Sequence, residues 1–494
     1  MRFIRGLSIL VIGSLFLSAC HQEATISPVA ESLPTSTKSL HAITPFFVQP
    51  QESFPTPTPT FPSEGINQKP ILGLVVEEIG PGNILDLVST AGTFWVRSHT
   101  AVSWAAVEPV EGQRNWSVLQ ELEEELRSIN HQGMQTILSV RVTPSWAQKE
   151  PGFSCGAIKP EKMRAFANFM GDLVARYQTE PYNVKYWEIW NEPDIEPALV
   201  SPDSPYGCWG DSSDPYYGGR YYADMLKEVY PSIKAADPLS IVLIGGLVLD
   251  CDPRPGSGCS AVKHDSQPSM FLEGILVNDG GSFFDGVSFH AYDYYLGELG
   301  QYSNPNWSSA WNTTGPVLIE KVHFIKDLLN RYGISGKILI NTETAILCGR
   351  SGQELPCKSD EFENTKAYYL AQSFSSALAE GLTANIWYSL FGWRASGLIN
   401  SGNLVPFPAF ESFHYLGSKL ESVQFLRKIN NYPNISGYEF AQDGKSIWVL
   451  WSQDGEDHPI LLPDTPRAGY DVFGNSISTT QEILITSAPI LLDW

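Results

Sequence analysis

Basic residues are scarce in this sequence. Its 494 residues include 32 lysines and arginines against 54 aspartates and glutamates, for a formal net charge of -22. No run of lysine or arginine offsets this excess of acid, so the surface would repel a polyanion such as nucleic acid. We therefore expect no nucleic-acid partner. The hydrophobic content of 43% indicates a folded chain, long enough for one large and one smaller domain.

The N-terminus lacks an apolar run long enough to span a membrane comfortably. Basic residues precede a short apolar stretch over residues 7–17, and small residues follow it, as in an export signal. The ending Leu17-Ser18-Ala19-Cys20 resembles the bacterial lipobox, which implies cleavage after residues 1–19 and a diacylglycerol on the Cys20 thiol. We expect an exported protein that is lipid-anchored at the bacterial cell envelope. The alternative is a plain secretory signal.

Cysteine is also rare. The chain has seven, and none of them forms a C-x-x-C pair, which argues against structural zinc, and we expect neither a metal nor another cofactor. Six cysteines follow Cys20, and an even number in an exported chain indicates disulfides. Sequence proximity favours two pairs and leaves a third: Cys251 with Cys259, Cys348 with Cys357, and Cys155 with Cys208.

Proline, threonine and serine are abundant in residues 20–68, where periodic apolar residues are missing. Such a segment cannot bury enough surface to offset its ordering entropy. The composition predicts an extended tether between the anchor and the folded body.

Residues 69–424 alternate short β-rich runs with longer amphipathic stretches. The expected strands are 71–76, 93–97, 135–142, 184–190, 241–247, 286–290, 337–341 and 385–389. Helical spacing falls at 118–132, 161–177, 219–236, 269–279, 316–332, 365–380 and 409–420, with a short connection at 84–90. The first strand lacks the glycine-rich phosphate turn of an open doubly wound sheet. The pattern therefore predicts an α/β fold, a closed (β/α)8 barrel.

The helical signal is missing from residues 425–494. Six strand-like runs separated by turns take its place, at 438–440, 446–452, 460–462, 470–473, 482–485 and 489–492. We expect a small antiparallel β-sandwich that packs on the barrel.

Two of the barrel strands run directly into acidic residues. The strand Lys-Tyr-Trp-Glu-Ile-Trp-Asn-Glu-Pro must stop at Pro193, so Glu192 lies at its carboxyl end. The strand Lys-Ile-Leu-Ile-Asn-Thr-Glu places Glu343 in the same way. Barrel active sites are built at this face. Glycosidic hydrolysis needs one carboxylic acid and a second carboxylate, and these glutamates supply the pair.

The segment Trp190-Asn191-Glu192-Pro193 resembles the Asn-Glu-Pro signature of the large (β/α)8 clan of retaining glycosidases, which includes cellulases, xylanases, mannanases and β-xylosidases. The resemblance covers about residues 70–425. It implies a carbohydrate substrate, Glu192 as general acid/base, Glu343 as nucleophile, and Asn191 bound to the 2-hydroxyl of the sugar. The C-terminal segment is similar, in strand pattern, to the accessory β domain of family 39.

The resemblance extends to further residues at strand ends. Arg97 matches the arginine that keeps the nucleophile ionised, and Tyr292 would donate its hydroxyl to Glu343. His290 would line the sugar pocket, or it is a structural histidine. Retention implies carboxyl groups about 5–5.5 Å apart, whereas about 8 Å would indicate inversion.

Six tryptophans are candidate sugar contacts. Four of them lie in predicted loops and are candidates for outer sugar subsites, with loop packing as the alternative: Trp209, Trp307, Trp311 and Trp393. Trp387 matches the aromatic floor beneath the sugar, with ordinary barrel packing as the alternative. Trp146 follows the third strand and is within reach of a substrate. Glu188 lies two residues before the strand end, so we assign it no chemistry.

Two other functions are compatible with the same pattern. The first is a surface lipoprotein that binds carbohydrate without turnover, against which the two intact glutamates argue. The second is a structural or adhesive envelope protein, which predicts no cleft with convergent carboxylates.

Overall fold

The computed structural model of the protein describes residues 70–77, 84–254, 267–295, 302–303, 307–311 and 313–494. The predicted signal, Cys20 and the tether lie outside the described residues. Within these ranges no helix combines the length and the apolar character that a membrane span requires.

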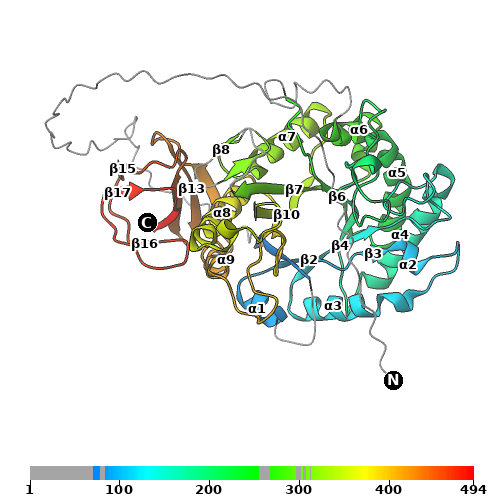
Figure 1. The fold of residues 1–494 in the computed structure, drawn as a ribbon, viewed down its shortest axis with the longest axis horizontal. Coiled ribbons are helices and arrows are strands. Elements are labelled where there is room, and N and C mark those ends of the chain that lie inside the picture. The colour runs from blue at the N-terminus through cyan, green and yellow to red at the C-terminus, as the bar shows by residue number, and fades with distance from the viewer. Residues whose placement is uncertain (1–69, 78–83, 255–266, 296–301, 304–306, 312) are drawn as a thin grey trace, which may run out of the picture. The chain divides into compact units, whose positions relative to one another are not determined.

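Eight parallel strands close into a barrel, as the sequence predicts (Figure 1). Neighbours in the sheet follow the order β10-β11-β1-β2-β4-β5-β6-β7, and pairing of β7 with β10 closes the ring. The strands are β1 (Leu72–Val76), β2 (Trp95–Ser98), β4 (Gln135–Arg141), β5 (Tyr186–Asn191), β6 (Ile241–Leu247), β7 (Gly286–Tyr295), β10 (Ile338–Cys348) and β11 (Ala384–Trp387). Short strands β3 (Val102–Ser103), β8 (Tyr302–Ser303) and β9 (Ser308–Ser309) extend the sheet.

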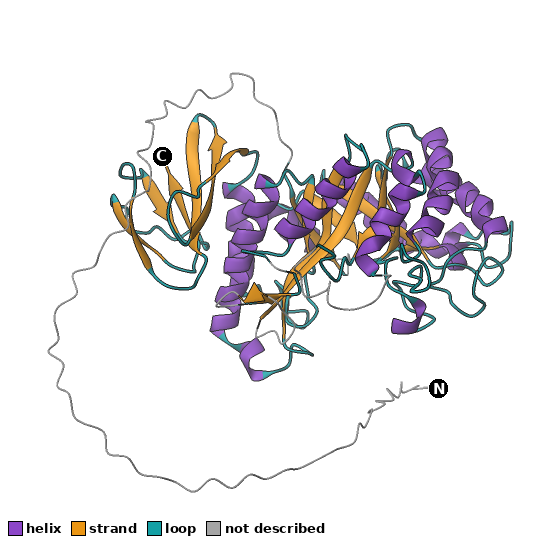
Figure 2. Ribbon diagram, turned by 90° about the horizontal axis from the view of Figure 1, so that it is seen from above, coloured by secondary structure: helices purple, strands orange, loops and turns teal. Residues whose placement is uncertain are grey.

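Helices follow the strands along the chain and pack around them (Figure 2). They are α1 (Ile84–Thr90), α2 (Trp104–Val107), α3 (Gln120–His131), α4 (Met163–Tyr177), α5 (Gly219–Ala236), α6 (Phe271–Val277), α7 (Leu318–Arg331), α8 (Asp360–Ala379) and α9 (Pro408–Lys419). Each of the seven predicted helical stretches overlaps one of these helices.

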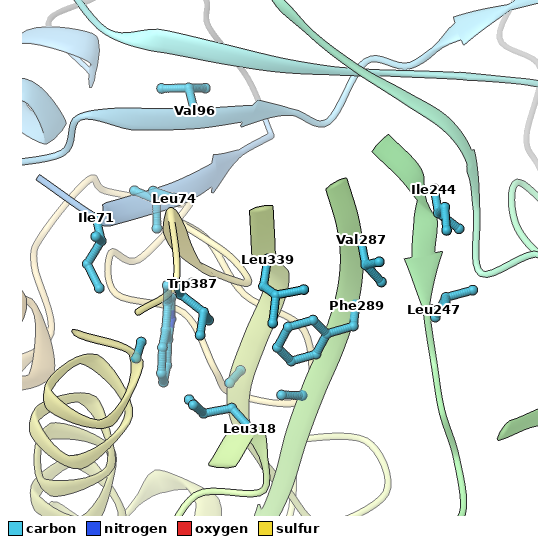
Figure 3. Packing of buried hydrophobic residues seen from close by; sticks show 14 of the residues in the cluster. Ile71, Leu74, Val96, Ile244, Leu247, Val287, Phe289, Leu318, Leu339 and Trp387 are labelled. Carbon is cyan, nitrogen blue, oxygen red and sulfur yellow. The ribbon is translucent and has the colours of Figure 1, made fainter. Parts of the chain in front are cut away.

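Each barrel strand presents alternate side chains to the two sides of the sheet. One set fills the barrel interior with a small apolar cluster: Val75, Trp95, Ile137, Leu243, Ile340, Ala384 and Ile386. The other set packs against the helices in a larger cluster, part of which Figure 3 shows. This alternation decides which strand residues reach the barrel mouth.

The C-terminal strands form two antiparallel sheets, as expected. The five-stranded sheet has the order β12 (Gln424–Lys428), β13 (Ile435–Gln442), β14 (Lys445–Ser452), β18 (Ile490–Asp493) and β16 (Ala468–Tyr470). The other pairs β15 (His458–Leu461) with β17 (Glu482–Ile485). The sequence did not reveal β12, because its residues are half-buried or exposed and lack apolar alternation.

Two disulfides have the predicted partners, Cys155 with Cys208 and Cys348 with Cys357. Their Cα atoms are 5.5 and 5.6 Å apart. Cys251 is disulfide-bonded, but Cys259, its predicted partner, lies outside the described residues.

Candidate active site

A buried carboxylate lies inside the barrel, on the inward face of β5. Glu188 is wholly buried, and its Oε2 accepts hydrogen bonds from Arg97 Nε at 2.9 Å and Arg97 Nη2 at 2.7 Å. Ser139 donates to the same oxygen, and Ser288 donates to Oε1 at 2.8 Å. Four hydrogen bonds from three strands therefore satisfy this carboxylate.

The charge of Arg97 keeps Glu188 ionised. Burial alone would raise the pKa of Glu188, but attraction to Arg97 and the hydrogen bonds from Ser139 and Arg97 hold the pKa below its usual value. A buried ion pair stabilises a protein only when its polar atoms are satisfied in this way.

Arg97 connects Glu188 to the residues at the barrel mouth. Its Nη1 donates to Glu343 Oε1 at 2.6 Å, and its Nη2 donates to Asn191 Oδ1 at 2.6 Å. Tyr292 donates its hydroxyl to the other oxygen of Glu343. Both carboxylate oxygens of Glu343 are thus fixed by hydrogen bonds.

Glu192 lies beyond the end of β5, in a strained backbone conformation. Its φ is +51°, and that of Trp190 is +79°, in a region that costs a non-glycine residue about 1–3 kcal/mol. The Glu192 N–H donates to the carbonyl of Gly246 at 2.9 Å. These two left-handed residues break the alternation of the strand.

His290, on β7, lies between the two mouth glutamates. Its Nδ1 is 2.8 Å from Glu192 Oε1 and 3.5 Å from Glu343 Oε2. Burial lowers the pKa of His290, but attraction to Glu343 and the hydrogen bond and charge of Glu192 outweigh burial and raise the pKa above 6.5.

The carboxylates of Glu192 and Glu343 face each other at close range. An oxygen of each and a ring nitrogen of His290 all lie within 4.8 Å of one another. Among the described residues, the spacing of these three side chains would also allow them to hold a metal ion. The two carboxylates are therefore close enough to contact the same bound group.

An open cavity of about 480 Å3 lies above this pair, within the size range of small-ligand sites. Its lining comes from the carboxyl ends of the strands and the loops that follow: Arg97, Ser98, His99, Ala101, Ser139, Arg141, Asn191, Glu192, Pro205, Tyr206, Tyr292, Glu343, Tyr388 and Trp393. The two glutamates therefore share one cavity.

Comparison with known proteins shows the fold. No protein-family model matches the sequence, and no curated protein matches it. The structure is similar to a family 39 glycoside hydrolase from Bacteroides cellulosilyticus WH2, with a TM-score of 0.62 and 18% identity over 86% of this chain and 81% of that one. The chain has the fold of the (β/α)8 glycoside hydrolases.

Other solved glycoside hydrolases share this fold. A family 30 endoxylanase from Clostridium papyrosolvens C71 matches with a TM-score of 0.55 and 11% identity, over 86% of this chain and 96% of that one. A family 51 arabinofuranosidase from Xanthomonas axonopodis pv. citri matches with a TM-score of 0.51 and 13% identity, over 86% and 96%. The predicted resemblance to this group of barrels is therefore confirmed for the fold.

The prediction that Trp387 forms the floor of the sugar site is wrong. The indole is wholly buried, donates to the carbonyl of Ser396 at 2.9 Å and lies in the outer apolar cluster (Figure 3). Tyr388 lines the cavity instead. Since Ile386 points into the barrel, alternation sends Trp387 outward and Tyr388 inward.

Two further residues differ from expectation. Trp146 does not line the cavity, because its indole donates to the Glu108 carbonyl at 3.0 Å and packs edge-on against Trp104. His290 contacts the glutamates from below and is 1% exposed, so it does not form part of the cavity wall.

Sequence reasoning also missed residues that the structure brings to the site. The ion pair between Glu188 and Arg97 is one example. Each is a charged residue within an otherwise apolar strand, so the sequence contained a signal from which their pairing could have been predicted. Arg141 and Tyr206 reach the cavity lining. Tyr206 comes from a loop, for which no periodic signal exists. Of the four loop tryptophans that the sequence offers as sugar contacts, Trp393 lines the cavity, whereas Trp209, Trp307 and Trp311 are at most 3% exposed.

Glu188→Gln tests the buried ion pair. We expect it to lower the free energy of unfolding by about 3 kcal/mol, because Arg97 loses a buried partner. The folded-state pKa of Glu188 is below the unfolded value of 4.5, so the stabilisation is complete above pH 4.5 and is lost as the pH falls through the folded pKa. Denaturant unfolding across pH measures both effects.

Glu228→Gln is the matched control. Glu228 pairs with Arg164 at 3.1 Å, and both side chains are exposed, so the same substitution should change stability by less than about 1 kcal/mol. A difference between wild type and Glu188→Gln that grows on acidification would overturn the assignment of an ionised Glu188.

Proposed function

We propose that the chain is a retaining glycoside hydrolase that cleaves O-glycosidic bonds by double displacement. The separation of Glu192 and Glu343 carries this proposal, because oxygens of the two carboxylates lie within 4.8 Å. Retaining enzymes hold their carboxyl groups about 5–5.5 Å apart, whereas inverting enzymes leave about 6.5–9.5 Å for a water molecule. The shared cavity supplies room for a sugar.

The surroundings of Glu343 suit a nucleophile. Hydrogen bonds from Arg97 and Tyr292 hold its two oxygens in one orientation. Burial and then the charge of Glu343 raise the pKa of Tyr292 well above 10, so the hydroxyl remains a donor. In the first step a Glu343 oxygen bonds to the anomeric carbon and the bond to the leaving oxygen breaks.

The surroundings of Glu192 suit the acid/base. Its side chain is 16% exposed and contacts His290 rather than an arginine. Glu192 gives its proton to the leaving oxygen in the first step and takes a proton from water in the second. The water oxygen then bonds to the anomeric carbon, and the ester to Glu343 breaks.

Asn191 is placed to bind the sugar. Its Oδ1 accepts a hydrogen bond from Arg97. The amide nitrogen of Asn191 therefore remains as a donor, and the residue lines the cavity. A hydrogen bond to a sugar hydroxyl that strengthens in the transition state would raise the rate of the chemical step.

Substitution of each glutamate tests the assignment. We expect Glu343→Gln to abolish turnover of aryl glycosides. Glu192→Gln should slow release of a poor leaving group by about 10²–10⁴-fold, and far less for dinitrophenolate, which departs without a proton. Release of chromophore measures the rates, and Glu228→Gln, at an exposed pair, is the control.

Proton NMR of the first product supplies an independent test. The sugar should leave with the anomeric configuration that it had in the substrate, and an inverted product would contradict double displacement. A wild-type chain that binds but hydrolyses no member of a panel of polysaccharides and aryl glycosides would favour a binding lipoprotein.

We also propose that the enzyme is exported and anchored to the cell envelope through a lipid on Cys20. The lipobox-like residues 17–20 support this. In a bacterial host, labelled palmitate should be incorporated into wild type, while Cys20→Ser should remain unlabelled and keep its leader. Equal labelling of both proteins would refute the anchor.

A further inference from the structure

A second cavity adjoins the active-site cavity. It has a volume of about 690 Å3 and lies between the loop after β10 and the loop after β11. Trp393 lines both cavities. The Trp393 side chain is therefore a shared boundary of the two cavities.

Trp393 is placed beside the reacting centre. Its side chain is 51% exposed, and its ring meets Tyr292 edge-on, with centroids 6.2 Å apart. Tyr292 in turn binds Glu343. A large exposed ring at this point is costly in water, and its flat apolar face suits the C–H face of a sugar.

The wall formed by the loop after β10 is fixed before any ligand binds. The Cys348–Cys357 disulfide closes this loop, and the Cys348 N–H donates to the Arg394 carbonyl at 2.9 Å. Gly352 has a φ of +77°, and a Cβ there would lie 2.6 Å from Ala395 N. The two loops therefore meet at a position that only glycine fits.

A buried lysine fixes the opposite wall. Lys366 Nζ donates to the carbonyls of Gly397 at 2.6 Å and Ala395 at 3.2 Å, and to Glu363 Oε1 at 2.7 Å. A preformed cavity lowers the entropic cost of binding.

The lining combines aromatic and polar groups, as sugar binding requires. Phe391 and Phe407 contribute rings. The polar residues of the rim are Ser351, Gln353, Lys358, Asp360 and Asn400. Glu363 and Arg394 add charged groups to the lining.

We propose that the second cavity binds further sugar units of the same substrate chain. This inference rests on the proposed function and specifies it: the substrate is an oligosaccharide or polysaccharide, and its units continue from the active-site cavity across Trp393. A glycoside with a small leaving group fills only the first cavity.

Chain-length kinetics test the proposal. The probes are cello-, xylo-, manno- and arabino-oligosaccharides of two to six units, with the nitrophenyl monoglycosides of the same sugars. For the sugar that is hydrolysed, kcat/KM should rise with chain length. The double variant Gln353→Ala/Lys358→Ala should lower the ratio of long-chain to monoglycoside kcat/KM by about tenfold, since each lost hydrogen bond costs a factor of about three.

Leu355→Ala is the matched control on the same loop. Leu355 lies between the two substituted residues, is 86% exposed and does not line the cavity, so its ratio should equal that of wild type. Circular dichroism melting verifies that each variant folds. If monoglycosides are hydrolysed but kcat/KM is flat with chain length, or the double variant leaves the ratio unchanged, the second cavity is not a sugar site. If no glycoside is hydrolysed, the proposed function itself fails.

Discussion

The contact between Glu188 and Arg97 is the constraint on which the site depends. One planar guanidinium joins β2 to β5 through Glu188 and Asn191, and to β10 through Glu343. Because the group is rigid, the positions of the three acceptors are coupled. Glu188 can be buried close to Glu343 because Arg97 and the hydroxyls of Ser139 and Ser288 donate hydrogen bonds to both oxygens of its carboxylate.

The two mouth glutamates lie close together but in different environments. Glu343 has a cation and a hydroxyl donor, whereas Glu192 has a histidine and a partly exposed side chain. Such a difference allows two like residues to take the roles of nucleophile and acid/base. The strained backbone at Trp190 and Glu192 re-aims the end of β5, at a cost that the surrounding contacts must offset.

Much of this arrangement was predictable from local sequence. Strand periodicity located the barrel, and Pro193 located the strand end that carries Glu192. The prediction for Trp387 was wrong because it considered the residue type and not the side of the strand on which the residue lies. Ile386 points into the barrel, so its neighbour Trp387 must point outward. Trp393 could not be placed in this way, because a loop with long-range contacts, such as that of Lys366 with Gly397, sets its position.

Covalent trapping is the most direct test of the central proposal, that Glu343 is the nucleophile. A 2-deoxy-2-fluoro glycoside with a good leaving group should form a glycosyl-enzyme, and mass spectrometry of the digested protein should find the label on the peptide that contains Glu343. A label on Glu192, or full turnover of substrate without any trapped ester, would contradict the account.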